Sequence, residues 1–271
     1  MTPILLVTGE AGSGKDTVAS FIAKDMNGIT IAQADPMKRF VAKTFGFTNE
    51  QLWGPSEARN TPDLRFDSTA YRNKVMLAVM AEAEEWISEV LPATRDDKMN
   101  LAYSRLMEWA SGMMTSAAED KGLTCRKVLQ TLGTEWGRQF SQDMWIDYAL
   151  VRAWGLLTGG CTYIPYHGVV PDEGNPGYGL VIISDGRFRN EILGVKKVGG
   201  RILKVINPVG AEVNAAEKAG VVGHRSEAEQ RNIPPWFFDV IYTNDKTTGL
   251  EGCQRKSLDA ALRLFPMENV K

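Results

Sequence analysis

The sequence of 271 residues contains few cysteines and no long apolar run. Its three cysteines, Cys125, Cys161 and Cys253, lie too far apart for a zinc knuckle or a redox C-x-x-C pair, so we expect idle, reduced thiols. No stretch approaches the roughly 18 apolar residues of a membrane span. The opening Met1-Thr2-Pro3 lacks the basic segment of a signal peptide. We therefore expect a cytoplasmic protein without membrane contact.

An excess of charge of one sign is also absent. The chain has 31 basic and 33 acidic residues, a formal net charge of −2. Such a balance supplies no broad field for wrapping a nucleic acid polymer or lying on anionic lipid, although a local cluster of positive charge is compatible with it. The apolar fraction of 44% and the charged fraction of 24% are ordinary for a soluble globular protein.

Short apolar runs alternate with helical patterns. Ile4 to Val7 is a continuous apolar run that ends before Gly9, as in a strand buried on both faces. We expect further strands at 29–31, 180–183, 202–206 and 240–242, and helices at about 15–22, 37–46, 189–198 and 250–264. The alternation predicts an α/β fold with a five-stranded, mostly parallel sheet covered by helices.

Residues 67–157 differ from the rest in composition, being rich in Ala, Met, Glu and Trp. We read them as a helical insertion, acting as a lid or in substrate binding, within a single domain of residues 1–271. Its large side chains recur at helical spacing, which favours core packing over the lining of a ligand site; they are Met76, Met80, Trp86, Met107 and Trp109. Residues 158–179 are rich in glycine and proline, so we expect a long loop or a hairpin.

The strongest motif runs from Gly9 to Thr17, between the first strand and the first helix, and fits G-x-x-x-x-G-K. Glycines in such a loop let backbone N–H groups turn toward phosphate oxygens, and the helix N-terminus adds partial positive charge. Lys15 can then reach the terminal phosphates as a point charge. We expect Gly12, Ser13, Gly14, Lys15 and Thr17 to bind the phosphates of a nucleotide.

Asp16 occupies the position after the lysine, where Ser or Thr is usual. A carboxylate beside a polyphosphate is unfavourable unless a magnesium ion or a substrate group intervenes. Asp16 and the hydroxyl of Thr17 are therefore candidate ligands for Mg²⁺, and Asp16 is also a candidate catalytic residue.

A second polar group follows the strand at 180–183. Asp185, Arg187 and Glu191 are spaced so that they can converge above the sheet edge where parallel sheets bind ligands. The arginine can neutralise charge on a transferring phosphoryl group. A helix cap with a surface ion pair is the simpler alternative.

The segment 126–135 reads as a helix that turns Arg126, Lys127 and Gln130 to one side. These side chains either face a cleft together or form a solvated helix face. Trp145 is equally open, because it can stack on a base or pack in a core.

Taken in order, the motifs resemble those of the bacteriophage deoxynucleoside monophosphate kinases, a branch of the P-loop nucleoside monophosphate kinases. The resemblance covers most of the chain apart from 67–121 and 158–179. It rests on Ser13-Gly14-Lys15-Asp16-Thr17, Ala34-Asp35-Pro36-Met37-Lys38, Arg126-Lys127 with Leu129 to Thr134, Asp185-Gly186-Arg187 with Glu191, His224-Arg225-Ser226-Glu227, and Thr243-Asn244-Asp245.

The resemblance implies a three-layer P-loop kinase fold and transfer of the γ-phosphoryl group of ATP to a deoxynucleoside 5′-monophosphate, with Mg²⁺. By position, Lys15, Asp16 and Arg187 are implied near the transfer, and Asn244 in the loop around adenine. The implied monophosphate side comprises Lys38, Arg126, Lys127, Gln130, Trp145, Asp185, Arg187 and Glu191, whereas His224 and Glu227 fit a loop ion pair equally well.

Two other functions are compatible with the phosphate-binding motif. One is a P-loop kinase for another small phosphorylated acceptor, and the other is a nucleotide-dependent switch or DNA-handling motor. The preferred base does not follow from the motifs, since it depends on the shape of a pocket. An exposed helical insertion can also pair with a second copy, which leaves room for a homodimer.

Overall fold

The computed structural model describes residues 2–10, 12–91, 96–207, 230, 232–244 and 249–266. The chain divides into two compact units. The first, called the sheet unit here, comprises residues 1–33 and 149–271, and the second, the helical unit, comprises 34–148. Each unit is described by itself.

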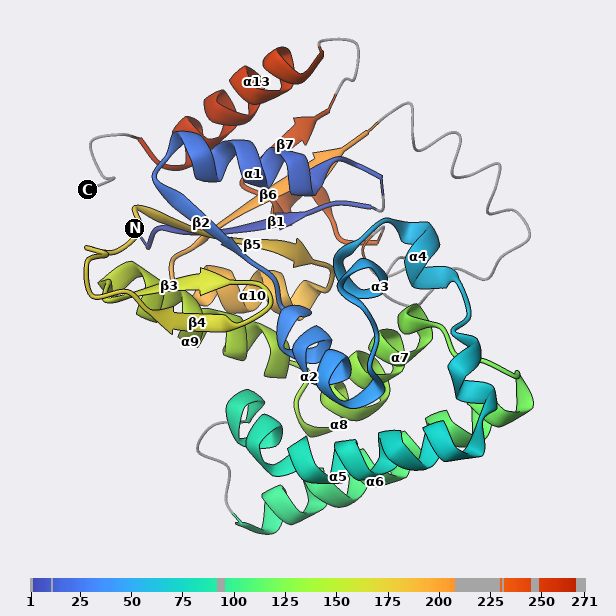
Figure 1. The fold of residues 1–271 in the computed structure, drawn as a ribbon. Coiled ribbons are helices and arrows are strands. Elements are labelled where there is room, and N and C mark those ends of the chain that lie inside the picture. Colours follow the sequence, from blue (N-terminus) through green and yellow to red (C-terminus); the bar gives the residue numbers. More distant parts are fainter. Residues whose placement is uncertain are drawn as a thin grey trace. The chain divides into compact units, whose positions relative to one another are not determined.

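The sheet unit is built on five parallel strands in the order β2-β5-β1-β6-β7 (Figure 1). The central strand β1 pairs with β5 on one side and β6 on the other, with Leu5 opposite Ile182 and Arg201. The α/β fold and five-stranded parallel sheet predicted from the sequence are confirmed. The strands are β1 (Ile4–Thr8), β2 (Gly28–Ile31), β5 (Leu180–Gly186), β6 (Arg201–Ile206) and β7 (Val240–Thr243).

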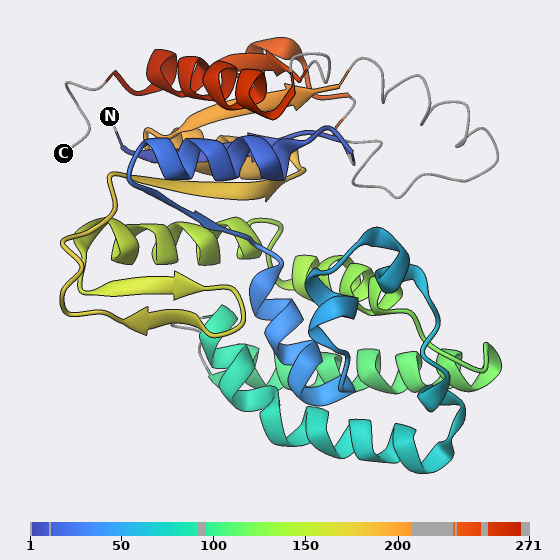
Figure 2. The same ribbon diagram turned by 45° about the horizontal axis from the view of Figure 1, so that its top comes forward.

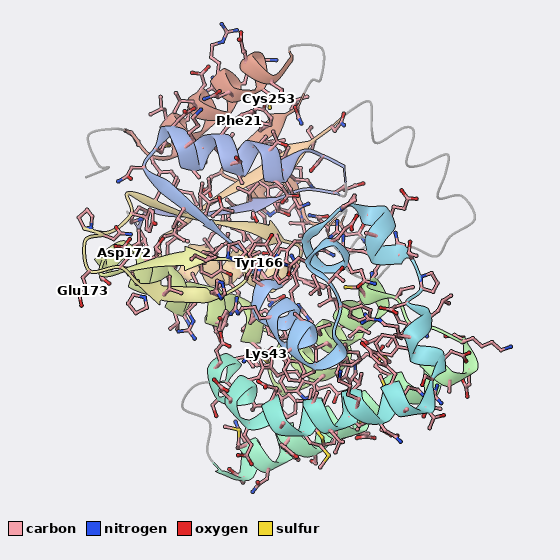
Figure 3. The ribbon with its side chains drawn as sticks, viewed as in Figure 1. Phe21, Lys43, Tyr166, Asp172, Glu173 and Cys253 are labelled. Atoms are coloured by element: carbon pink, nitrogen blue, oxygen red, sulfur yellow. The ribbon has the colours of Figure 1, made fainter. Side chains whose placement is uncertain are left out.

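Helices cover both faces of this sheet, which explains the continuous apolar runs Ile4 to Val7 in β1 and Leu180 to Ile183 in β5. On one face, α1 (Lys15–Asp25) and α13 (Gly249–Leu264) pack against each other and bury Ile22 and Ala261 with Leu5 and Leu203. Figure 3 labels Phe21 and Cys253 in this layer. On the other face, α10 (Arg189–Lys197) packs against β1 and β6 (Figure 2).

The glycine- and proline-rich segment 158–179 contains an antiparallel hairpin, so the hairpin alternative holds. It is formed by β3 (Cys161–Ile164) and β4 (Gly168–Pro171), with Cys161 opposite Pro171. Asn175 binds the segment after β4 to the start of β3, because its side chain donates to the carbonyl oxygen of Cys161 at 2.9 Å.

The helical unit has an aromatic core. Trp86 lies at its centre: it stacks on Phe40 with ring centroids 4.2 Å apart and donates its indole N–H to Pro36 O at 3.0 Å. The helices that surround it are α2 (Asp35–Phe45), α3 (Asn49–Trp53), α4 (Ser56–Asn60), η1 (Leu64–Asp67), α5 (Thr69–Val90), α6 (Asp96–Glu119), α7 (Cys125–Thr131), the π-helical turn η2 (Leu132–Gly137) and α8 (Arg138–Phe140). The following helix, α9 (Met144–Thr158), crosses the division between the units.

The observed helical unit starts earlier than the insertion expected at 67–157. Helix α2 packs against α5 and therefore belongs to it, although its sequence reads as the second helix of a strand-helix alternation. Of the large side chains expected to pack in this core, Met80 is the exception, with 51% of its surface exposed. The single-domain organisation with an insertion stays a prediction. Within the described ranges, no helix is both long and apolar enough to cross a membrane.

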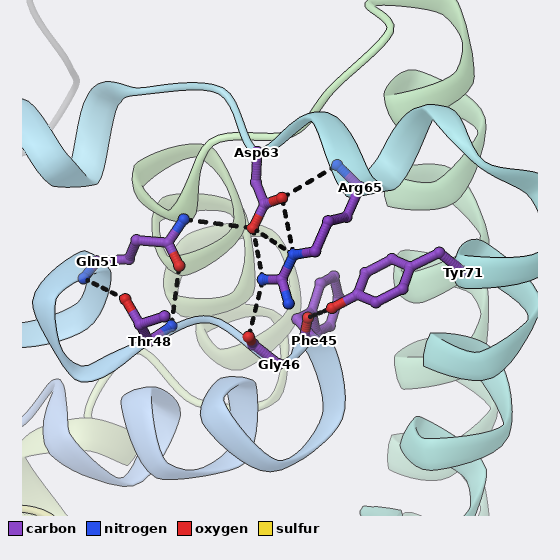
Figure 4. Close-up of polar contacts among 7 residues, drawn as sticks. All are labelled: Phe45, Gly46, Thr48, Gln51, Asp63, Arg65 and Tyr71. Carbon is purple, nitrogen blue, oxygen red and sulfur yellow. Dashed lines mark hydrogen bonds and ion pairs between the residues drawn. The ribbon is translucent and has the colours of Figure 1, made fainter.

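A polar network joins α2, α3 and η1 on the surface of the helical unit (Figure 4). Arg65 donates to the Asp63 carboxylate at 2.6 Å and to the carbonyl oxygen of Gly46, just beyond α2, at 2.9 Å. Gln51 also donates to Asp63, at 3.3 Å, while forming a capping box with Thr48. Burial acts to raise the pKa of Asp63, but the hydrogen bonds from Arg65 and Gln51 outweigh it and keep the pKa below its ordinary value.

We expect Asp63→Asn to lower the free energy of unfolding at pH 7 by about 1 kcal/mol, a modest figure because Arg65 is half exposed. A lowered native pKa stabilises the fold above the unfolded-state pKa of about 3.9, and this stabilisation is lost as the pH falls through the native pKa. Urea unfolding at several pH values checks this.

The difference between wild type and variant must shrink at low pH, and a constant difference would contradict the assignment. Glu119→Gln, on the exposed end of α6, removes a carboxylate outside this network and serves as the control.

Candidate active site

The glycine-rich loop connects the carboxyl end of β1 with α1. Gly12 and Gly14 have φ values of +79° and +82°, a region that residues with a Cβ rarely adopt. Gly14 is the N-cap of α1, and Lys15 is its first residue. The first N–H groups of an α-helix lack helical partners and carry partial positive charge. The loop therefore has the backbone form of a phosphate cradle.

The first turn of α1 carries Lys15, Asp16 and Thr17. Lys15 Nζ lies 3.6 Å from Asp16 Oδ2, and the lysine side chain is only 15% exposed, against 77% for that of Asp16. Thr17 is also exposed. Carboxylate and hydroxyl oxygens are ligands that Mg²⁺ accepts together with phosphate oxygens and water. The two residues fit such a shared site, and the described part of the chain holds no group of three or more His, Cys, Asp and Glu side chains that would form a protein-only metal site.

Asp185 and Glu191, at the carboxyl end of β5 and in α10, both bind backbone N–H groups. Asp185 Oδ1 accepts from the N–H of Gln33 at 2.8 Å. The buried carboxylate of Glu191 accepts from the N–H groups of Arg187 and Phe188 at 2.6 and 3.0 Å. The side chain of Arg187 is exposed and has no hydrogen bond or ion pair to any residue that the structure describes. The two carboxylates thus shape the loop and leave the guanidinium available.

Two carboxamide side chains hold the backbone at this edge of the sheet. Asn244 is buried after β7 and donates to the carbonyl oxygen of Ser13 at 2.9 Å. Gln230, also buried, donates to Thr8 Oγ1 at 2.7 Å and to Gly186 O at 3.4 Å, which joins the ends of β1 and β5. Sequence reasoning placed Asn244 in an adenine loop and missed Gln230, because a lone glutamine carries no spacing signal.

Lys204 was not predicted from the sequence. It is a second lysine near the start of the glycine-rich loop. It pairs with Thr8 in the register of β6 and β1, and its ammonium group lies 4.6 Å from the ring centre of Phe238. Burial lowers the pKa of Lys204, and the charge of Glu10 acts in the opposite direction. The signal was present, since a lysine interrupts the otherwise apolar strand 202–206.

The helical unit contains a second cluster of positive charge, around the buried thiol of Cys125. Burial raises the pKa of Cys125 to about 12, while the nearby charges of Arg59, Lys38 and Arg126 act to lower it. Arg59 Nε is buried without a hydrogen-bond partner among the described residues. Arg59 was not predicted from the sequence, because it lies in a short helix without a motif. Three cations and an unpaired donor fit an anionic ligand.

Further contacts of Lys38 and Arg126 with described residues lie within the helical unit. Lys38 lies 3.4 Å from the buried Asp35 carboxylate and 5.3 Å from the ring centre of Trp53. Arg126 donates to Ser56 Oγ at 2.8 Å, which links α7 to α4. Asp35 balances part of the charge that the three cations supply.

Lys127 and Gln130 lie on α7 with Arg126, but Lys127 is engaged elsewhere. Its ammonium group bonds to Ser116 Oγ at 2.5 Å and to Asp120 at 3.0 Å, and this hydrogen bond lowers the pKa of Asp120. Gln130 is half-buried. Substrate contacts of both residues stay predictions.

Trp145, in α9, contacts the π-helical turn η2. Its indole N–H donates to the carbonyl oxygen of Gly133 at 2.9 Å, and its ring lies so close to Gly137 that a Cβ there would stand 2.5 Å from the ring. Trp145 is 5% exposed and lies 6.4 Å from Trp86, centre to centre. The residue packs in the core, and its predicted contact with a substrate base is untested.

The stretch containing His224 and Glu227 lies outside the described residues. The other predicted site residues fall into two groups, one in each unit. The sheet unit brings Gly12, Ser13, Gly14, Lys15, Asp16, Thr17, Asp185, Arg187, Glu191 and Asn244 to the carboxyl ends of its strands, and the helical unit contains Lys38, Arg126, Lys127, Gln130 and Trp145.

Comparison with known proteins identifies the family of the chain. A family model described as deoxynucleotide monophosphate kinase matches residues 3–216, a range that includes the glycine-rich loop, the whole helical unit and Arg187. A protein of Acanthamoeba polyphaga mimivirus, provisionally named a deoxynucleotide monophosphate kinase, is 26% identical over 242 residues, which cover 88% of this chain and 86% of that protein. Because the family model matches well over half of its length, the chain belongs to the deoxynucleotide monophosphate kinase family.

Proposed function

We propose that the protein transfers the γ-phosphoryl group of ATP to the 5′-phosphate of a deoxynucleoside monophosphate, giving ADP and a deoxynucleoside diphosphate. The observation that carries the proposal is the cradle between β1 and α1, with Gly14 in a left-handed conformation and Lys15 opening the helix. Membership of the kinase family supports the reaction class.

On the donor side, the cradle and Lys15 would bind the β- and γ-phosphates. Asp16 and Thr17 would hold Mg²⁺, which supplies charge neutralisation for the polyphosphate when bound. Asp16 is 77% exposed, so its carboxylate can meet an ion brought in with the nucleotide without a desolvation penalty in the free protein.

On the acceptor side, the cluster of Lys38, Arg59 and Arg126 offers a site for the monophosphate group. A phosphate dianion would satisfy the buried Nε of Arg59, which has no hydrogen-bond partner among the described residues. Arginine suits this role because its planar donors match phosphate oxygens.

The transfer itself needs no strong base. An oxygen of the acceptor phosphate attacks the γ-phosphorus, the bond from the γ-phosphorus to the bridging oxygen breaks, and ADP leaves with the electron pair. Most of the catalysis is positioning and stabilisation of the charge on the transferring group. Lys15 and the exposed guanidinium of Arg187 supply positive charge for it. The carboxylate of Glu191 accepts from the backbone N–H of Arg187 and holds that backbone in place.

An ADP-release assay with a panel of acceptors tests the proposal. We expect turnover with ATP and Mg²⁺ to require a deoxynucleoside monophosphate and to be weak with phosphorylated sugars or acids. Turnover that responds only to those compounds would point to a kinase for another small phosphorylated acceptor. Turnover that depends on DNA or a protein partner would point to a switch or motor, and either result would overturn the proposal.

Lys15→Ala and Arg187→Ala should each lower kcat by about two to four powers of ten, because each removes charge stabilisation of the transferring group. Steady-state kinetics on folded variants measure this. Lys24→Ala, at the exposed far end of α1, and Arg189→Ala, in the first turn of α10, are the matched controls. Near-normal turnover of Arg187→Ala would remove that residue from the mechanism.

Arg59→Ala should raise the KM for the monophosphate by about tenfold to a hundredfold, the size of a lost charged hydrogen bond, and leave ATP binding unchanged. Arg105→Ala, on the exposed face of α6, is the control. An unchanged KM for every accepted monophosphate would place the acceptor phosphate elsewhere.

A further inference from the structure

Two buried asparagines contact successive carbonyl groups of the glycine-rich loop. Asn207 follows β6 and donates to the carbonyl oxygen of Gly12 at 3.4 Å. Asn244 follows β7 and donates to that of Ser13 at 2.9 Å. They are 8% and 7% exposed. The backbone of the loop is thus bound from the ends of two neighbouring strands.

These contacts determine which way the peptide groups of the loop face. A trans peptide unit is planar, with its C=O and N–H pointing in opposite directions. When Asn244 binds the carbonyl of Ser13, the N–H of Gly14, in the same peptide unit, points away from the asparagine. The N–H of Ser13 donates to Glu10 O at 3.1 Å, so this internal contact holds the neighbouring peptide. Asn244 therefore sets the direction of a donor at the helix N-terminus.

Asn244 is itself held from both sides. Its backbone N–H donates to Ile206 O at 2.8 Å, which continues the pairing of β7 with β6, and its Oδ1 lies 3.7 Å from the thiol of Cys253. A Cβ on Gly14 would overlap the amide nitrogen of Asn244, so a glycine at 14 is required by the contact as well as by its φ. With Oδ1 facing the thiol, Nδ2 remains for Ser13.

We propose that Asn244 is a positioning residue for the phosphate cradle, acting through the peptide between Ser13 and Gly14 rather than through the base of the nucleotide. The proposal depends on the proposed function only in that the loop binds a polyphosphate. It is independent of the acceptor, because its test needs no phosphoryl transfer.

Calorimetric titration of the folded full chain with two probes, magnesium tripolyphosphate and magnesium ATP, tests the proposal. Asn244→Ala removes the donor, and Asn244→Asp places a carboxylate against the carbonyl of Ser13. We expect each variant to bind both probes about tenfold more weakly or worse, by equal factors and with Asp the weaker binder. Equal factors are expected because both probes contain the polyphosphate that the loop would bind, and tripolyphosphate lacks only the nucleoside.

Gln254→Ala is the matched control. Its carboxamide joins α13 to Asp25 of α1 at 3.0 and 3.1 Å, so its loss removes a similar tie in the same layer without touching the loop. We expect this variant to bind both probes as the wild type does. Thermal unfolding without ligand identifies a merely destabilised variant, which would have a lowered Tm but wild-type affinities well below that Tm.

Two results would overturn the proposal. Weakened ATP binding with unchanged tripolyphosphate binding would assign Asn244 to the base, and unchanged binding of both probes would remove it from the site. If the wild type binds neither probe, the cradle assignment fails together with this proposal. If both probes bind as expected but no monophosphate is phosphorylated, the proposed function fails while the role of Asn244 stands.

Discussion

The site of the sheet unit depends on the parallel direction of its five strands. Because all five run the same way, their carboxyl ends meet at one edge, and each following segment brings polar groups there. The glycine-rich loop follows β1, Asp185 lies in β5 with Arg187 directly after it, and β6 and β7 lead to Asn207 and Asn244. A strand running in the opposite direction would carry its polar residues to the far edge, where they would not meet the cradle.

Much of this could be predicted from the sequence. Short apolar runs indicate buried parallel strands because both faces of such a sheet are covered, and Lys15 with its glycines indicates a cradle because it lies between a strand and a helix. These features follow from the order of residue types along the chain and do not require knowledge of which side chains meet in space. The position of Arg187 after a strand was predictable for the same reason.

The partners of individual side chains were not predictable in this way. Glu191 binds the backbone N–H groups three and four residues before it, Lys127 pairs with Asp120, and Trp145 donates to Gly133. These partners lie close in sequence, but which of several neighbouring groups a side chain binds depends on the local conformation at helix ends and turns. Arg59 carried no motif, and its unpaired buried donor becomes visible only when neighbouring helices are in place. The helical unit begins at 34 rather than 67 for the same reason, since the contact of α2 with α5 decides it.

The helical unit is a single excursion of the chain, which leaves the sheet unit after residue 33 and re-enters it at 149. It departs after β2, an outer strand of the sheet, so the pairing of the central strand β1 with β5 and β6 does not depend on it. Given the proposed roles of the two units, evolution can reshape the acceptor module by insertion, deletion or exchange while the donor machinery stays the same. Variation in length among relatives should therefore concentrate between 34 and 148.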